Sequence, residues 1–196
     1  MKIDGGLMGD LAKAGTSAKR LESIGFHGAI TAETSHDPFF PLLLAAQETE
    51  NIELVTSIAV AFARTPMNLA NVGHDLNSFS KGRFVLGLGS QIRPHITKRF
   101  SMPWSRPAAR MREFILAMRA IWDCWHNGTP LTFQGEFYTH SLMTPMFTPL
   151  DTKYGAPKVF LAAVGPRMSE VAGEVADGIL IHGFTTEKYL REVTLP

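Results

Sequence analysis

Cysteine, charge imbalance and long apolar runs are all scarce in this sequence of 196 residues. The single cysteine excludes an internal disulfide and a zinc site built from paired Cys-x-x-Cys motifs, and it favours a reducing compartment. The net charge of +1 lacks the basic excess that binding to nucleic-acid phosphates requires. No apolar run approaches the ~18 residues of a membrane span, and the first residues lack the apolar core of a signal peptide. We therefore expect a cytoplasmic protein without a metal and without a nucleic-acid or membrane partner.

Several catalytic motifs are missing as well. The sequence contains no HExxH, no GxSxG and no P-loop. The dinucleotide fingerprint GxGxxG is incomplete, because Gly87-Leu88-Gly89 is followed by Ile92 where the third glycine would stand. This absence weighs against an open-sheet dinucleotide-binding fold.

Short apolar runs instead alternate with amphipathic segments along most of the chain. The periodicity predicts strands at 2–8, 28–33, 53–60, 84–88, 158–163 and 178–182, with helices between them. Asp37-Pro38, Thr65-Pro66, Arg106-Pro107 and Gly165-Pro166 each mark the start of a helix. Six units of this kind predict an α/β fold with a parallel sheet and outer helices, and both a (β/α)8 barrel and a doubly wound sheet fit.

One segment interrupts the alternation. Residues 129–157 are rich in Pro, Thr and aromatic side chains, and we expect an ordered excursion with a hairpin near 133–138. The chain is thus predicted to be a single domain over 1–196 with an insertion at about 129–157.

In either architecture the functional site lies at the carboxyl ends of the strands. Glycine there lets a planar or phosphorylated ligand approach the backbone, and a glycine before a helix N-terminus exposes N–H groups to an anion. Turn glycines and an ordinary strand–helix junction are the structural alternatives. The candidate ligand contacts are Gly6, Ser57, Ile58, Gly89, Ser90, Val164, Gly165 and His182.

Two titratable side chains near the end of the second strand are candidates for catalysis. His36 precedes a predicted helix start and could donate a proton, and Glu33 is the best-placed carboxylate. The alternative roles are a structural histidine and a salt bridge beneath a loop.

The residues resemble the luciferase-like monooxygenase superfamily, and most of all its branch of coenzyme F420-dependent oxidoreductases. The resemblance lies in GFHGAITAETSHDPFFPLLLAA, ELVTSIAVAFARTPMNLA, SKGRFVLGLGSQIRPHI, PWSRPAARMREF and FLAAVGPRMSEVAGEVADG. It implies a (β/α)8 TIM barrel with a deazaflavin or flavin at its mouth. It further implies a cis peptide at Ser57-Ile58 behind the cofactor ring, phosphate contacts at Val164-Gly165, and ring contacts at Gly89 and Ser90.

The sequence departs from the family pattern at the proton donor. Glu33-Thr34 stands where many deazaflavin members have Asp-His, and Ser90 stands where others have a catalytic Glu. His36 or Glu33 would then supply the proton. The resemblance implies an oxidoreductase that transfers a hydride between reduced coenzyme F420 and a small organic substrate. The alternatives are an FMN-dependent monooxygenase, a phosphosubstrate lyase or isomerase, and a non-catalytic fragment or cofactor-binding protein.

Length sets one more expectation. A (β/α)8 enzyme needs about 250 residues, so the 196 residues accommodate only about six of eight units. We expect an incomplete barrel: a fragment, the product of a premature stop, or half of an assembly closed by another chain. A homo-oligomer, most simply a dimer, is the expected assembly.

Overall fold

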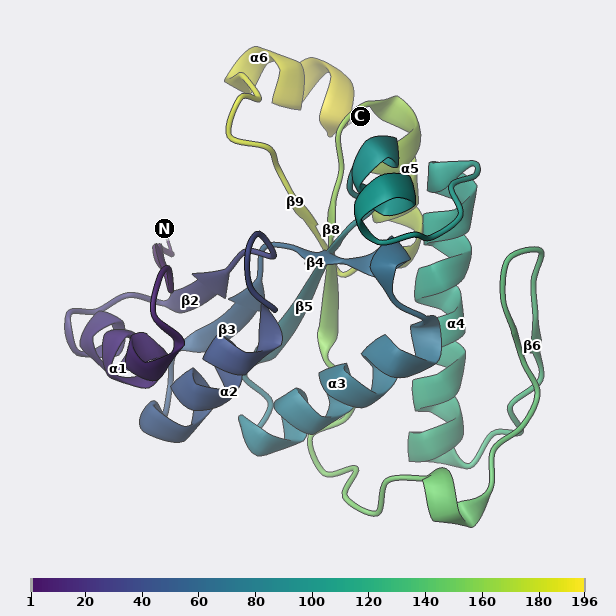
Figure 1. Cartoon of the computed structure of the whole chain (residues 1–196), viewed down its shortest axis with the longest axis horizontal. Helices are drawn as coiled ribbons and strands as arrows, with labels where there is room; N and C mark the ends of the chain where they lie inside the picture. Colours follow the sequence, from purple (N-terminus) through teal and green to yellow (C-terminus); the bar gives the residue numbers. More distant parts are fainter. Residues whose placement is uncertain (1, 196) are drawn as a thin grey trace.

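The computed structural model describes residues 2–195, and its main feature is one parallel sheet that curls into part of a barrel (Figure 1). The hydrogen-bonded order is β1-β2-β3-β5-β8-β9, and β4 pairs with β5 beyond the end of β3. The predicted incomplete (β/α)8-type sheet is therefore confirmed, with six strand positions among the described residues. The strands are β1 (Asp4–Gly6), β2 (Gly28–Thr31), β3 (Glu53–Thr56), β4 (Ala59–Val60), β5 (Phe84–Gly89), β8 (Lys158–Ala162) and β9 (Gly178–Leu180).

Helices cover the convex face of this sheet, and each packs against the next along the chain. They are α1 (Ala14–Ser23), α2 (Phe39–Glu48), α3 (Pro66–Phe79), α4 (Pro107–Asn127) and α5 (Pro166–Val175), followed by the single turn α6 (Glu187–Tyr189). Short 3-10 turns occupy Leu11–Lys13, Ala61–Ala63 and Pro145–Phe147, and π turns occupy His95–Arg99 and Leu190–Thr194.

Local capping explains where several helices begin. Thr65 Oγ1 accepts a hydrogen bond from the Asn68 N–H at 3.1 Å, as the sequence predicts. At α2 the start differs, because Pro38 is the N-cap residue and Asp37 Oδ1 accepts from the Phe39 N–H at 2.9 Å from one position earlier. Thr186 Oγ1 caps the last helical turn by accepting from the Tyr189 N–H at 3.2 Å. The third strand also differs, since the expected run 53–60 is divided into β3 and β4.

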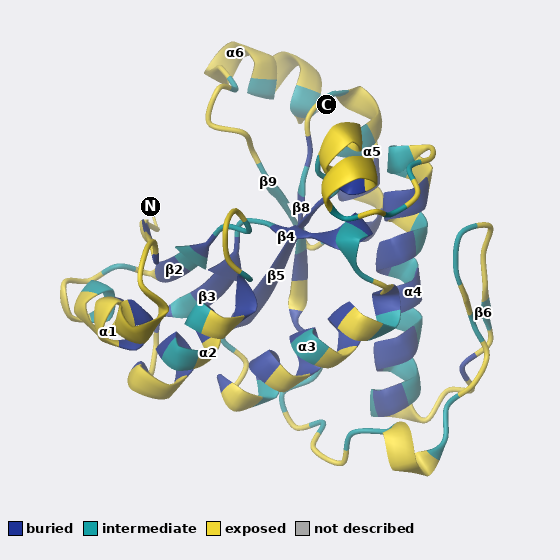
Figure 2. Cartoon of the chain, in the orientation of Figure 1, coloured by how far each residue is buried: buried dark blue, intermediate teal, exposed yellow. Residues whose placement is uncertain are grey.

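The core lies between the sheet and its helices, and the largest helix supplies much of it (Figure 2). The Trp122 side chain is 2% exposed, and its Nε1–H donates to the Ala70 carbonyl of α3 at 3.0 Å. Seven large apolar side chains of α4 are buried in the core: Met111, Phe114, Ile115, Met118, Ile121, Trp122 and Trp125.

Two glycines leave room for atoms of the neighbouring strands of the sheet. A Cβ on Gly178 would lie 2.7 Å from the Phe160 ring. A Cβ on Gly87 would lie 1.8 Å from the Thr56 carbonyl oxygen and 2.8 Å from the Leu180 side chain. These glycines are therefore required by close packing within the sheet.

The excursion forms a small hairpin attached to α4. Its strands are β6 (Phe133–Gln134) and β7 (Thr139–His140), so the second strand lies just beyond the predicted hairpin at 133–138. The Glu113 carboxylate of α4 accepts backbone N–H bonds from residues 136, 137 and 138, at 2.6–2.9 Å. Arg110 Nε adds a bond of 2.8 Å to the Tyr138 hydroxyl. These contacts fix the hairpin to α4, and the later part of the excursion is bonded to α3 through Asn77 and Ser78.

At the amino ends of the strands, Arg83 closes the bottom of the sheet. Its guanidinium donates to the carbonyls of Ala46, Thr49 and Ile52 at 2.9–3.1 Å. The preceding turn places Lys81 and Gly82 at φ +59° and +85°. Part of the SKGRF motif is thus explained by structure at the end of the sheet opposite the candidate site.

Candidate functional site

The candidate site is built on the kink in the third strand, at the carboxyl edge of the sheet. The Ser57–Ile58 peptide is cis, which confirms that expectation. The Ser57 N–H donates to the Thr31 carbonyl at 2.6 Å. The Ile58 side chain lies over Gly89 of β5, where a Cβ would approach Ile58 Cδ1 to 2.9 Å. Ser57, Ile58 and Gly89 are therefore brought together, and Ser90 continues directly from Gly89.

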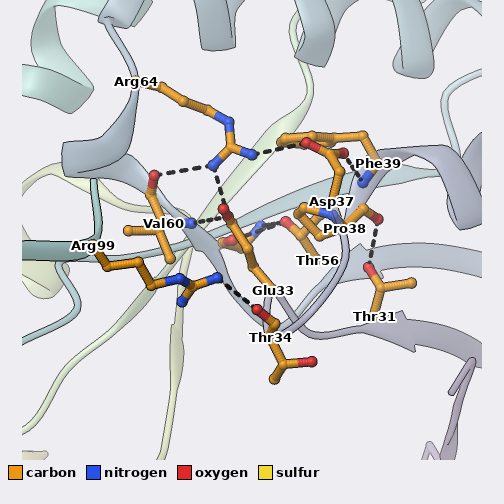
Figure 3. A network of polar contacts seen from close by, with 11 residues as sticks. Thr31, Glu33, Thr34, Asp37, Pro38, Phe39, Thr56, Val60, Arg64 and Arg99 are labelled. Carbon is orange, nitrogen blue, oxygen red and sulfur yellow. Dashed lines mark hydrogen bonds and ion pairs between the residues drawn. The ribbon is translucent and has the colours of Figure 1, made fainter. Parts of the chain in front are cut away.

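Glu33 lies beside this kink and is bonded on several sides (Figure 3). Its Oε2 accepts from the Val60 N–H at 2.7 Å and from Arg64 Nη1 at 2.7 Å. Arg64 Nη2 donates to Asp37 Oδ2 at 2.9 Å. The Glu33 side chain is 6% exposed and that of Arg64 is 15% exposed. The carboxylate predicted as a catalytic group thus takes part in a largely buried ion-pair network.

His36, the other predicted catalytic residue, is exposed in the loop between β2 and α2. The loop is tied down on both sides of it. Arg99 Nη2, from the π turn after β5, donates to the Thr34 carbonyl at 2.6 Å, and Arg64 holds Asp37 (Figure 3). The imidazole is therefore carried on an anchored loop and remains accessible to a ligand.

A second part of the site is a cavity of about 660 Å³ where α4 and α5 begin. Gly165 caps α5 at φ +82° and ψ 158°, a conformation almost restricted to glycine, and no atom lies within 4 Å of the position of an added Cβ. Because the helix starts at Pro166, the first-turn N–H groups are those of Arg167 and Met168. The cavity is lined by residues 106–109 and 164–168.

Two helix N-termini and two arginines thus border one cavity, whose wall is otherwise mostly apolar. Arg106 belongs to the wall and is ion-paired with Glu136. Sequence analysis found Val164 and Gly165 and missed Arg106 and Arg167. The signal in the sequence was a basic residue next to the proline that begins a helix, namely Arg106 beside Pro107 and Arg167 beside Pro166. These two helices follow β5 and β8, which are neighbours in the sheet.

The remaining predicted contacts lie at the same edge. Gly6 ends β1 and is exposed, and the Val164 side chain is 75% exposed beside the cavity. His182 lies two residues after β9, is exposed, and has its ring centroid 5.1 Å from that of Phe184. The structure does not join these three residues to the Glu33 network through any hydrogen bond.

Residues 2–195 contain neither a metal-binding cluster nor a membrane-spanning helix. No group of three or more His, Cys, Asp or Glu side chains there is arranged to hold a metal ion. Within the same range, no helix has both the length and the apolar character needed to cross a membrane.

Comparison with known proteins identifies the family. The family model described as luciferase-like monooxygenase matches residues 2–194. The chain belongs to this family. An uncharacterized protein of Mycobacterium tuberculosis (strain ATCC 25618 / H37Rv) is 61% identical over 196 residues, which is all of this chain and 58% of that protein.

Two other proteins similar to this luciferase-like chain have names that mention coenzyme F420. A second protein of the same M. tuberculosis strain, provisionally named a coenzyme F420-dependent oxidoreductase, is 30% identical over 168 residues, covering 81% of this chain and 48% of that protein. The solved structure of an F420-dependent secondary alcohol dehydrogenase with an F420-acetone adduct superposes with a TM-score of 0.82. Its sequence identity is 19%, and the match covers 100% of this chain and 62% of that one, so it supports the fold.

The chain spans about half the length of the curated relatives it matches, 58% of one and 48% of the other. The activity of the whole protein is therefore treated as a proposal.

Proposed function

We propose that this luciferase-like protein is an oxidoreductase that transfers a hydride between reduced coenzyme F420 and a small organic substrate. The observation that supports it most is the cavity formed by the N-termini of α4 and α5 at the carboxyl edge of the sheet. The phosphate of a cofactor would be held there by backbone N–H groups and by arginine.

The residues present fit such a cofactor on structural grounds. The open space in front of Gly165 leaves its backbone accessible, so a phosphate could approach without meeting a side chain. The half-buried Ile58 and the adjacent Ser90 offer a surface for a planar ring, with Gly89 beneath Ile58. When bound, reduced deazaflavin supplies a hydride from its C5 atom, and the protein provides orientation and exclusion of water.

His36 is the group that we propose for proton transfer. Its imidazole is exposed at the mouth, and its loop is anchored through Thr34 and Asp37. An imidazole can donate or accept a proton through its ring nitrogens, so His36 could serve the substrate atom that becomes negatively charged. Glu33 is less available for this task because its carboxylate is already bonded to Arg64 and Val60.

A second candidate function is an FMN-dependent monooxygenase, which the description of the matching family favours. FMN also carries a phosphate, so the same cavity would serve it. The two candidates differ in the ring atom that reacts and in the requirement for oxygen, and these differences can be measured.

Titration of the purified protein with each cofactor tests the proposal. We expect coenzyme F420 to bind, with quenching of its fluorescence, and FMN to bind at least tenfold more weakly, a difference of ~1.4 kcal/mol. Arg106→Gln and Arg167→Gln should weaken binding, and Arg191→Gln, at an exposed ion pair after β9, serves as the control. Tight binding of FMN without binding of F420 would replace the first candidate with the second.

A further inference from the structure

We infer that Glu33 and Arg64 are a positioning pair, which holds the kinked third strand in the place where the proposed cofactor ring would lie. This inference deepens the proposed function and rests on it for the ring. It gives Glu33 a task other than proton transfer, and it assigns Arg64 to the site. Both conclusions follow from the contacts of the two side chains.

Glu33 spans the kink with two different groups. Its backbone N–H donates to the Ile58 carbonyl at 3.1 Å. Its carboxylate accepts from the Val60 N–H, two residues further along, at 2.7 Å. One residue of the loop after β2 thereby fixes both ends of the segment 58–60, which connects the kink to β4.

Arg64 holds that carboxylate in place and joins it to the start of α2. Nη1 donates to Glu33 Oε2 at 2.7 Å and to the Val60 carbonyl at 3.3 Å, and Nη2 donates to Asp37 at 2.9 Å. The guanidinium also lies 5.4 Å from the centre of the Phe39 ring. A planar fork of donors suits this arrangement, because it reaches two carboxylates at once.

Burial explains why the pair acts as a unit. The two side chains are 6% and 15% exposed, so removal of Arg64 would leave the Glu33 carboxylate largely buried without a cationic partner. Glu33 Oε2 already accepts two hydrogen bonds, from the Val60 N–H and from Arg64 Nη1. It is therefore suited to fixing the backbone, and the exposed His36 is left as the group that exchanges protons with a ligand.

The consequence concerns the Ile58 side chain. Ile58 covers Gly89 at the mouth, and its carbonyl is bonded to Glu33. Loss of the ion pair should release the segment 57–63, and with it the surface offered to the ring. The effect should be seen in the free protein as local mobility and in the loaded protein as weaker cofactor binding.

The experiment compares Glu33→Gln, Arg64→Met and Arg64→Lys with a control. Arg112→Met is the control, because it removes a half-exposed ion pair with Glu174 on the helical face, away from the kink. Hydrogen exchange of peptides covering 57–63 is measured without cofactor. The dissociation constant for coenzyme F420 and the pH profile of kcat/KM are measured with it.

We expect Arg64→Met to accelerate exchange in 57–63 and to weaken F420 binding by about tenfold or more, with Arg64→Lys intermediate, because an ammonium cannot bridge two carboxylates. Glu33→Gln keeps an acceptor for the Val60 N–H, so it should fold, bind more weakly and retain both limbs of the pH profile. Arg112→Met should leave all three measurements unchanged.

Two results would overturn the inference. One is exchange in 57–63 that is no faster in Arg64→Met than in Arg112→Met. The other is loss of a limb of the pH profile in Glu33→Gln, which would identify Glu33 as a proton donor. Should neither cofactor bind, the proposed function fails by itself, and the exchange data still decide whether the pair positions the kink.

Discussion

The imidazole rings of His74 and His126 lie with their centroids 5.6 Å apart, where α3 packs against the C-terminal end of α4. His74 Nδ1 and His126 Nε2 are buried, and no hydrogen-bond partner for either is found among residues 2–195. Burial, and then the proximity of His74, lower the pKa of His126. Burial also lowers the pKa of His140, on strand β7 of the excursion. The junction between the excursion and the helices therefore depends on neutral histidines.

We expect this junction to make the protein less stable in mild acid. In the unfolded chain His126 and His140 bind protons as the pH falls through about 6.5, whereas the folded protein keeps them neutral to lower pH. The unfolded state then binds more protons. The free energy of unfolding should have its full value above about pH 7. It should decrease below about pH 6.5, before most carboxylates titrate.

Thermal unfolding between about pH 7.5 and 5.5 measures this effect, and each ~1 kcal/mol lost should lower Tm by ~2–4 °C in a chain of this size. Replacing both residues, as His126→Gln with His140→Gln, should flatten the dependence. His95→Gln, at an exposed histidine, should not alter it. A Tm that does not change with pH in the unmodified protein would contradict the prediction.

Close packing of the sheet predicts a large effect at Gly87. Alanine there would place Cβ 1.8 Å from the Thr56 carbonyl oxygen of β3. This oxygen cannot move away without breaking hydrogen bonds between β3 and β5. We expect Gly87→Ala to lower the free energy of unfolding by at least ~1–3 kcal/mol in urea titrations. Gly173→Ala is the matched control, since it lies in α5 with open space around it and should stabilise the helix by ~0.5–1 kcal/mol. Equal effects of the two substitutions would count against this account.

The conformation of Gly165 predicts a double effect of Gly165→Ala. A side chain at φ +82° and ψ 158° should cost ~1–3 kcal/mol of stability. It would also occupy the open space in front of the proposed phosphate position, so cofactor binding should weaken further than stability alone explains. Gly183→Ala, at an open position without a positive φ, is the control. Calorimetric titration separates the two effects, and unchanged binding would remove Gly165 from the site.

The role proposed for His36 predicts a selective loss of turnover. His36→Gln should lower kcat by ~10²–10⁴-fold, because a positioned acid or base contributes that much. The F420 dissociation constant should change little, and the corresponding limb of the pH profile should disappear. His95→Gln, at another exposed histidine after β5, should leave kcat intact. Full activity of His36→Gln would exclude it as the proton donor.

The fold was predictable where local chemistry determines it. Strand and helix positions follow from apolar periodicity, and the cap at Thr65 follows from a side chain that bonds to a neighbouring backbone group. The break in the third strand could not be derived in this way, because residues 53–60 form one mostly apolar run without glycine or proline. Only the family resemblance indicated the cis peptide at Ser57-Ile58.

The site was predictable only in part, for a related reason. Gly165 and His36 stand at strand ends, which the topology selects. Arg64 was missed because its partner Glu33 is 31 positions away, and an ion pair across that separation leaves no local pattern. Arg106 was missed because its relation to Gly165 arises only when α4 and α5 are placed side by side.

The order of strands in the sheet has a consequence for how the molecule assembles. The path β1-β2-β3-β5-β8-β9 follows the chain, so each strand pairs with the strand position before it and the one after it. Contacts between residues that are near in sequence form quickly. They allow the chain to fold from its N-terminus while it is being synthesised. On this basis the loop of His36 and the Glu33–Arg64 pair would form while α5 is still being made. The anion cavity, which needs both α4 and α5, would form after them.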